Sequence, residues 1–217
     1  MNLKEISKNP LFKGIEYDEL EKLLVCLKAH TKVFTKHEFI LRRGTHVTQI
    51  ALLVRGSALI IKDDYWGNRT IIKEVLRGEL FGEAYACVPN VELEVSVLAK
   101  DDCEILFLDT LHMLQVCCNA CHYHQRLIQN LLTIASMKNI MLTQKIEHIT
   151  KRSIREKILS YLSSQSLERG SRRIDIPFDR QQLADYLSVD RSALSAELSK
   201  MRKEGILEYQ KNHFRLL

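Results

Sequence analysis

The chain has 217 residues, of which 46% are hydrophobic, and its formal net charge is +5. It contains no apolar run of the roughly 18 residues that a membrane-spanning helix needs, and its first residues lack the apolar core of a signal peptide. These features argue against a membrane span and lead us to expect a cytoplasmic protein whose six cysteines are reduced thiols.

The positive charge is concentrated at one end of the chain. Residues 150–217 contain 14 Lys and Arg against 9 Asp and Glu, whereas residues 1–149 contain 18 of each. Phosphate contacts supply most of the non-specific affinity of DNA-binding proteins. The excess is modest, so it supports DNA binding only together with a motif in the same region.

The first half of the chain has the pattern of a short helix followed by a β domain. Leu20, Leu23, Leu24 and Leu27 share one helical face. After about Thr31, short β-type runs recur roughly every ten residues and are separated by glycine turns, which predicts an all-β sandwich or barrel. The runs are residues 39–41, 50–54, 58–61, 70–72 and 95–98, and the turns contain Gly44, Gly56, Gly67 and Gly78.

A glycine- and glutamate-containing motif, Gly78-Glu-Leu-Phe-Gly-Glu83, lies inside this β region. Taken alone, it predicts only two β-turns whose glycines adopt positive φ. Its position after short strands and before the C-terminal motif described below makes it more informative.

Residues 111–149 contain no Pro or Gly, and their apolar residues recur in alternating four- and three-residue steps. This spacing predicts one long helix whose heptad seam meets the same helix of a second copy, with Asn139 pairing with its symmetry mate. A second stripe of Leu127, Leu131, Ile134 and Met141 is expected to pack on the chain's own β domain. The alternative is a long helix internal to a monomer. The predicted dimer interface is Ile128, Leu132, Ala135, Asn139, Leu142 and Ile146.

The head of this helix carries Cys117, Cys118, Cys121 and His122, and the thiols are spaced to share a helical face. Thiolates and imidazoles at such spacings bind zinc, an iron–sulfur cluster or haem iron, or form a thiol switch. We favour the simpler interpretation that the cysteines are small buried hydrophobic residues, and we assign no metal. A metal- or redox-responsive sensor is the alternative function.

Residues 179–205 have the pattern of two helices joined by a tight turn. Asp179 and Gln182 match a capping box, Asp190 is a good cap for the second helix, and Gly205 is a good terminator. Together with two apolar stripes they predict a helix-turn-helix that places its second helix in the major groove of DNA, rather than an ordinary helical hairpin. The turn is Ser188-Val189, with Val189 directed inward, and the stripes are Leu183, Ala184 and Leu187 in the first helix and Leu194, Leu198 and Met201 in the second.

The polar face of the second helix carries short donors and an arginine, which suit base edges and phosphates. After it, two apolar runs flank Lys211-Asn212, which predicts a β-hairpin wing or, alternatively, a terminal hairpin that only covers the core. The candidate DNA-binding residues are Arg180, Gln181, Asp190, Arg191, Ser192, Ser195, Ser199, Lys200, Arg202 and Lys211.

The order of these features resembles the catabolite activator protein/FNR (Crp/Fnr) family of bacterial transcription regulators. The resemblance rests on Gly44, Gly56, residues 78–83, the long helix and residues 179–217. It implies an α+β fold: a cyclic-nucleotide-binding-type β-roll, which is a double-stranded, jelly-roll-like sheet, over residues 1–110, a dimerisation helix over 111–149 and a winged helix-turn-helix over 150–217. It also implies a homodimer on a near-palindromic double-stranded DNA site, with RNA polymerase as a further partner.

Two other classes of function were weighed. One is a small-molecule or redox sensor that acts through protein partners, with a helix-turn-helix that is only structural. The other is an enzyme, which we do not expect because the sequence has no nucleophile–base pair, phosphate loop or acid–base constellation.

Cyclic-nucleotide binders of this family hold the ligand with a Gly-Glu pair like Gly82-Glu83 and grip its phosphate with an Arg-Ser pair about eleven residues later. Counted without gaps, the Arg-Ser positions are Leu93 and Glu94 here. A phosphate in a partly dry pocket needs a cation or several donors, and Leu93 offers neither while Glu94 repels it. We therefore expect an unidentified effector other than cyclic AMP. The candidate effector pocket is Gly82, Glu83, Ala84, Leu93 and Glu94.

The predicted second helix departs from the family at one further position. Family members often carry an Arg directly after the residue that matches Ser195, and this chain has Ala196. The sequence therefore predicts the class of partner, DNA, but not a family consensus for the bound sequence.

Overall fold

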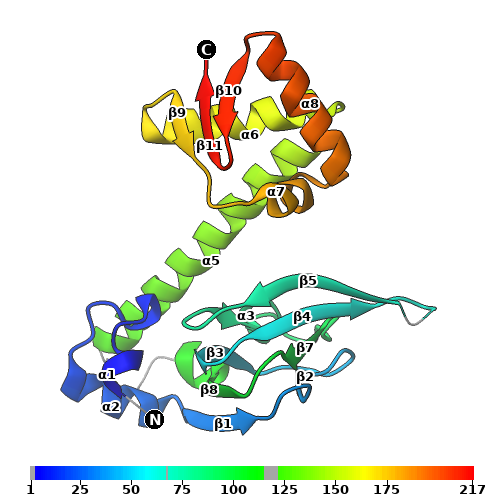
Figure 1. Cartoon of the computed structure of the whole chain (residues 1–217). Helices are drawn as coiled ribbons and strands as arrows, with labels where there is room; N and C mark the ends of the chain where they lie inside the picture. Colours follow the sequence, from blue (N-terminus) through cyan, green and yellow to red (C-terminus); the bar gives the residue numbers. More distant parts are fainter. Residues whose placement is uncertain (1–2, 67, 115–121) are drawn as a thin grey trace. The chain divides into compact units, whose positions relative to one another are not determined.

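The computed structural model describes residues 3–66, 68–114 and 122–217. The chain divides into two compact units, Met1–Ile134 and Ala135–Leu217, and the boundary lies inside helix α5 (His122–Ile149) (Figure 1). The predicted long helix is therefore present, but it contributes to both units. Its expected start near Leu111 is not observed, because a separate helix α4 (Thr110–Leu114) lies there and residues 115–121 are outside the described ranges.

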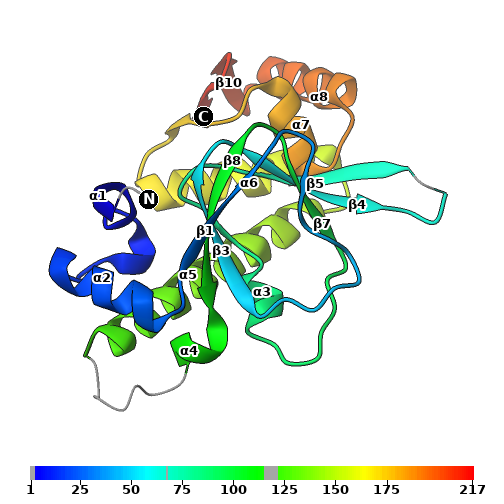
Figure 2. The same cartoon turned by 90° about the horizontal axis from the view of Figure 1, so that it is seen from below.

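The N-terminal unit is built on two four-stranded antiparallel sheets, as the β-roll expectation requires (Figure 2). One sheet has the strand order β1-β8-β3-β6 and the other β2-β7-β4-β5. Short helices accompany the sheets: α1 (Leu3–Ile6), the 3-10 turn η1 (Pro10–Phe12), α2 (Tyr17–Cys26), α3 (Glu83–Ala86) and α4. The strands are β1 (His30–Phe34), β2 (Phe39–Leu41), β3 (Gln49–Arg55), β4 (Ala58–Asp63), β5 (Arg69–Val75), β6 (Leu80–Phe81), β7 (Ser96–Ala99) and β8 (Cys103–Asp109).

Strands β3 and β8 are paired at the centre of the first sheet and are buried on both faces. Ala51 and Leu53 belong to the core shared with the second sheet, whereas Ile50 and Leu52 belong to the core shared with the helices. Successive side chains of a strand point to opposite faces, so burial on both faces requires a continuous apolar run. This explains why residues 50–54 read as uninterrupted Ile-Ala-Leu-Leu-Val.

Glycines make the turns at the predicted places. Gly44, Gly56, Gly78 and Gly82 all adopt positive φ, between +78° and +86°. At Gly56 a Cβ would also collide with the carbonyl oxygen of Asp102. Gly82 precedes α3 in the left-handed conformation, so the 78–83 motif forms the two turns predicted for it.

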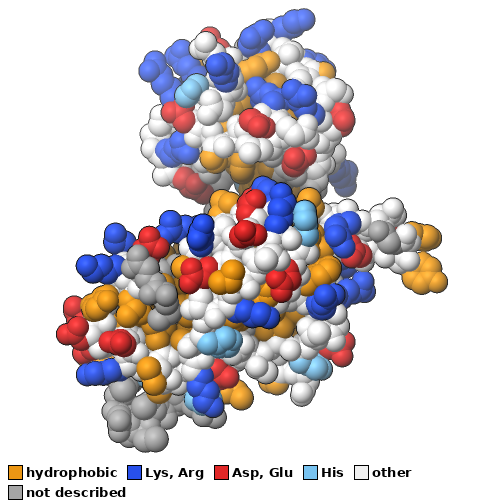
Figure 3. Space-filling model, turned by 60° about the horizontal axis from the view of Figure 1, so that its bottom comes forward, with side chains coloured by type: hydrophobic (Ala, Val, Ile, Leu, Met, Phe, Trp, Pro, Cys, Tyr) orange, Lys and Arg blue, Asp and Glu red, His pale blue; other side chains and the backbone are white. Residues whose placement is uncertain are grey.

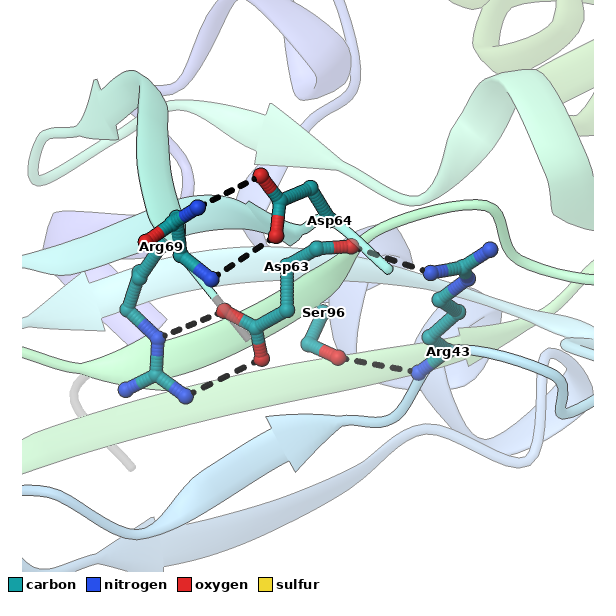
Figure 4. A network of polar contacts seen from close by, with 6 residues as sticks. Arg43, Asp63, Asp64, Arg69 and Ser96 are labelled. Carbon is teal, nitrogen blue, oxygen red and sulfur yellow. Dashed lines mark hydrogen bonds and ion pairs between the residues drawn. The ribbon is translucent and has the colours of Figure 1, made fainter. Parts of the chain in front are cut away.

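The β4–β5 hairpin is held together at its turn end by a polar network (Figure 4). Arg69 donates to both carboxylate oxygens of Asp63, at 2.9 and 3.1 Å, and this hydrogen bonding lowers the pKa of Asp63. Arg43 donates through Nη1 to the Asp63 carbonyl and through its backbone N–H to Ser96 Oγ. In the loop that connects the two strands, Tyr65 and Trp66 are almost fully exposed, and hydrophobic side chains project from the hairpin in Figure 3.

Helix α5 buries one of its two predicted stripes and exposes the other. Leu127 and Leu131 are buried in the core with α2, and Asn130 Nδ2 donates to the carbonyls of Leu11 and Lys13 at 2.9 Å each. Met141 was expected in the buried stripe but is 64% exposed, because the stripe extends past the end of the N-terminal core at Ile134. Of the predicted dimer interface, Leu132, Ala135, Asn139, Leu142 and Ile146 are exposed and Ile128 is half-buried.

The C-terminal unit packs three helices on a small sheet of order β10-β11-β9. Helix α6 begins with a capping box formed by Ser153 and Glu156, and it ends at Gly170 in the left-handed conformation. One core joins all its elements, with Tyr161, Ile174, Leu183, Leu198 and Phe214 among the buried residues. The elements are α6 (Ile154–Arg169), β9 (Arg173–Asp175), α7 (Arg180–Leu187), α8 (Arg191–Lys203), β10 (Leu207–Gln210) and β11 (His213–Leu216).

Candidate nucleic-acid interface

Helix α7 is held by hydrogen bonds at both of its ends. Gln182 N–H donates to Asp179 Oδ1 at 2.8 Å, and Asp179 N–H donates to Gln182 Oε1 at 2.9 Å, which completes the predicted capping box. Ser188 ends α7 in the left-handed conformation. Lys157 Nζ of α6 donates to the carbonyls of Leu187 and Ser188, which satisfies two acceptors at this helix end.

Asp190 caps α8, and this is the role that its carboxylate plays in the structure. Its Oδ1 accepts from the backbone N–H groups of Ser192 and Ala193, at 2.8 and 3.0 Å, and from the Ser192 hydroxyl. These hydrogen bonds lower the pKa of Asp190. The cap orients the first turn of α8, so Asp190 acts on the interface through the backbone.

The predicted polar face of α8 is exposed, and its opposite stripe is buried. Leu194, Leu198 and Met201 are fully buried in the unit's core. Arg191, Ser192, Ala196 and Lys200 are exposed, as are Arg202 and Lys203 in the last turn. Figure 3 shows Lys and Arg side chains spread over the face of this unit.

All three predicted serine donors are already engaged: Ser192 donates to the capping Asp190, and Ser195 and Ser199 donate within α8. Ser195 Oγ donates to the Arg191 carbonyl, and Ser199 Oγ donates to the Ser195 carbonyl, both at 2.9 Å. Ser199 Oγ also lies 3.3 Å from the hydroxyl of Tyr209 on β10. Both serines are half-buried, so they present less polar surface than the helical pattern predicts.

Arg155 of α6 forms two ion pairs with carboxylates at α8. Its Nε lies 2.6 Å from Glu197 Oε1 and its Nη1 lies 2.8 Å from Glu204 Oε2. The pair raises the pKa of Arg155 and lowers that of Glu204. One guanidinium thus binds the middle and the C-terminal end of α8, which restricts rotation of the helix about its own axis. Arg155 is not predictable from the sequence, because Arg155 and Glu197 are 42 positions apart and no local pattern connects them.

The wing is present and is pinned to α7. Arg180 Nη2 donates to the Lys211 carbonyl at 3.1 Å, and the guanidinium lies over the rings of Tyr209 and Phe214. Burial lowers the pKa of this half-buried arginine. Asn212 Nδ2 donates to the Ile176 carbonyl at 3.1 Å, which ties the wing turn to the end of β9. Arg180 therefore positions the wing, whereas the Lys211 side chain is exposed at its tip.

A groove of about 650 Å³ connects these elements. It is lined by the first turn of α7, by Arg191 at the start of α8, and by Lys211 and Asn212 in the wing turn. The amide N of the exposed Gln181, which also lines it, donates to Asp185 at 2.8 Å. The groove thus has three cations in its lining, Arg180, Arg191 and Lys211, against the one carboxylate of Asp179, which caps α7, and this excess of positive charge suits a phosphate backbone.

In the β-roll, the positions of the candidate effector pocket do not supply a cation. Leu93 is buried, with 2% of its surface exposed, and Glu94 is exposed with its carboxylate 3.7 Å from Lys62 Nζ. Gly82 and Glu83 lie at the start of α3, followed by the exposed Ala84. Lys100, the next cation along the chain, is exposed and bonds to Glu74 at 2.7 Å.

The predicted cysteine cluster lies outside the described residues, because Cys117, Cys118 and Cys121 all fall within residues 115–121. His122 is exposed in the first turn of α5 and contacts the ring of Tyr123 edge-on. Among the residues that the structure describes, no group of three or more His, Cys, Asp or Glu side chains could hold a metal ion.

Two family models match the chain in the order that the fold displays. The cyclic nucleotide-binding domain matches residues 31–119, and the Crp-like helix-turn-helix domain matches residues 156–217. This chain belongs to the Crp/Fnr family. It is a DNA-binding transcription regulator of the Crp/Fnr type, and the structures it resembles are transcription regulators rather than enzymes.

Several solved structures share the fold of this Crp/Fnr regulator. A variant of CprK complexed with OCPA is 16% identical, with a TM-score of 0.64 over 90% of this chain and 89% of that one. The c-di-GMP-responsive global regulator CLP of Xanthomonas campestris is 17% identical, with a TM-score of 0.57 over 93% and 99%. A CooA mutant from Carboxydothermus hydrogenoformans is 15% identical, with a TM-score of 0.57 over 100% and 91%. No curated protein matches the sequence of this regulator significantly.

None of the helices in the described part of this regulator has both the length and the hydropathy needed to cross a membrane.

Proposed function

We propose that this Crp/Fnr regulator binds a near-palindromic DNA site as a homodimer and that a ligand other than cyclic AMP controls it. In this proposal α8 lies in the major groove, where Arg191 and Ser192 face base edges. Gln181, Lys200, Arg202 and Lys211 bind phosphates, and the partly engaged Ser195 and Ser199 make secondary contacts. Arg180 and Asp190 act indirectly, the first through the wing and the second through the α8 cap.

The observation that carries the DNA-binding geometry is the groove between α7, α8 and the wing. Arg191 and Lys211 approach it from two different elements, and α7 presents its N-terminus to it. The three cations in the lining of the groove, Arg180, Arg191 and Lys211, match the repeating charge of a DNA strand. A terminal hairpin that only covered the core would not need a wing tip held by Arg180 and Asn212.

The dimer is supported by the exposed seam of α5. Leu132, Leu142 and Ile146 are each more than half exposed, although they lie at heptad positions. Apolar side chains in such a row are stable in water only when a second surface covers them. A two-fold symmetric pair of α5 helices covers both rows at once, and it places two recognition helices on half-sites about one DNA turn apart.

The nature of the signal is proposed from the β-roll. Leu93 and Glu94 stand where the family's cyclic-nucleotide binders carry Arg and Ser, so the phosphate of cyclic AMP would meet a buried leucine and a carboxylate. The shared fold does not set the ligand, since similar structures are described as complexed with OCPA or as responsive to c-di-GMP. The effector can act only by binding more tightly to one arrangement of the two recognition helices than to the other.

We further propose RNA polymerase as a partner and the cytoplasm as the location, because both follow from transcription control by the family.

The proposal is tested by selecting sites for the full-length protein from a random double-stranded DNA library. We expect enriched sequences with two inverted half-sites, and sedimentation equilibrium should give two protein chains per bound duplex. Recovery of no enriched sequence, or a complex with one chain per duplex, would contradict the proposed mode of binding.

A further inference from the structure

Ala196 is an exposed residue on the polar face of α8, the face that would read DNA bases in the proposed complex. It lies on α8 four residues after Ser192 and four before Lys200, so the three side chains form one row on the exposed face. This row is opposite the buried Leu194, Leu198 and Met201. The part of α8 directed away from the core therefore has a methyl group at its centre.

The polar side chains next to Ala196 do not supply a free group that could hydrogen-bond to a base in its place. The hydroxyl groups of Ser195 and Ser199 each donate a hydrogen bond to a backbone carbonyl of α8 itself. Arg155 binds Glu197, the residue directly after Ala196, at 2.6 Å from the side of α6. The fully buried Leu194, Leu198 and Met201 fix the opposite side of α8 in the core, so the Cβ of Ala196 is directed away from the core.

Only one base presents an apolar group in the major groove, and that base is thymine with its 5-methyl group. A short side chain such as alanine also allows the helix backbone to approach closely, which brings the two methyl groups into contact. We propose that Ala196 selects a thymine in each half-site by packing its methyl group against the thymine 5-methyl group. This inference rests on the proposed placement of α8 in the major groove.

The size of the effect follows from the area that the two methyl groups bury. Loss of one buried methyl-sized group costs about fourfold in affinity. A dimer that reads two half-sites should therefore lose about 15-fold when both thymines are changed. The hydrogen-bonding edge of the base plays no part in this discrimination.

The test uses full-length protein and the duplex recovered from the random library. Each thymine of the half-site is replaced in turn by uracil, which lacks only the 5-methyl group, and affinity is measured by fluorescence anisotropy. We expect one thymine position per half-site at which uracil weakens binding about fourfold. In an Ala196→Gly variant uracil and thymine should bind equally at that position.

Ala193→Gly is the matched control. It imposes the same cost of a glycine inside α8, but Ala193 is half-buried beside the cap, so the preference for thymine should remain. An Ala196→Arg variant selected on the same library should prefer guanine at the same position, because an arginine reads guanine with two hydrogen bonds.

Enrichment of a site at which no uracil substitution weakens binding would overturn this inference and leave the proposed function standing. A thymine preference that persists in Ala196→Gly would overturn it as well. Failure to enrich any sequence would overturn both the proposed function and this inference.

Discussion

Arg155 Nε lies 2.6 Å from Glu197 Oε1, and this contact joins α6 to the face of α8 that flanks the exposed row. The same guanidinium reaches Glu204 at 2.8 Å, so one residue of α6 bonds to α8 at two points. The buried stripe of Leu194, Leu198 and Met201 sets which side of α8 faces the core, and these two bonds add polar contacts between α6 and α8.

We expect Arg155→Met to lower the midpoint of thermal unfolding of the C-terminal unit and to weaken DNA binding. The substitution keeps the aliphatic stem but leaves Glu197 and Glu204 without their cation. Calorimetry and DNA titrations check both effects. Arg169→Met, on the same helix and hydrogen-bonded to Gln165 of α6 itself, should change neither. Equal effects of the two substitutions would show that α8 does not depend on Arg155.

We expect Leu142→Asp to convert the dimer to a monomer. Each copy of Leu142 contributes at least about 1.5 kcal/mol when buried. A dimer with both copies lost is therefore weaker by about 3 kcal/mol, or roughly 100-fold, before the cost of burying a carboxylate is added. Sedimentation velocity measures the shift. Thr133→Asp, which is exposed on α5 but outside the seam, serves as the control, and an equal loss of dimer in that variant would argue against the seam.

We expect Lys200→Ala and Lys211→Ala to weaken binding to all DNA sequences alike. Each lost phosphate contact makes the negative slope of log affinity against log salt shallower by about 0.9. A dimer loses two contacts per substitution, so its slope should become shallower by about two units. Titrations between low and moderate salt give this slope. Lys22→Ala, which is exposed on α2, should leave it unchanged. A salt dependence that Lys200→Ala and Lys211→Ala do not alter would remove these residues from the phosphate contacts.

We expect the protein to lose stability as the pH falls below about 6.5, the ordinary pKa of histidine. Burial lowers the pKa of both His124 and His148, so the unfolded chain binds protons more readily than the folded one. Their neutral forms therefore contribute fully above pH 6.5, and the contribution declines as the pH approaches the lowered values. The slope from each histidine cannot exceed about 1.4 kcal/mol per pH unit.

His148 offers the sharper test of this pH dependence. It accepts from or donates to Ser160 Oγ at 2.9 Å and contacts the rings of Tyr161 and Tyr186. His148→Gln should make the unfolding midpoint of the C-terminal unit less sensitive to pH between 7 and 5. A pH profile that His148→Gln leaves unchanged would contradict the assignment.

We expect millimolar cyclic AMP to leave the thermal midpoint and the DNA affinity of the protein unchanged. A ligand present at 100 times its dissociation constant stabilises a protein by about 2.7 kcal/mol, which a thermal shift assay detects. Leu93 and Glu94 supply no cation for the phosphate. A saturable thermal shift with cyclic AMP would contradict our reading of these two positions.

Much of the winged unit could be predicted because its signals are local. The Asp179–Gln182 box, the Asp190 cap, the Ser188 turn and the positive φ of Gly205 all involve residues within a few positions of one another. The glycine turns of the β-roll were predictable for the same reason. Four strands escaped prediction, and two of them, β6 and β9, have only two and three residues. Strand β1 has a single buried residue, Phe34, and β8 has an apolar run that periodicity alone cannot assign to helix or strand.

The sequence by itself therefore determined the glycine turns of the β-roll and the helix-turn-helix with its caps. Only the tertiary structure decided how candidate residues are used. In the structure Arg180 contacts the wing, and Arg155 forms ion pairs with two carboxylates. Ala196 faces outward between two serines whose hydroxyls are hydrogen-bonded to the helix backbone. The reason is physical: caps and turns depend on hydrogen bonds between near neighbours, whereas the free surface of a side chain depends on contacts with segments that are distant in sequence.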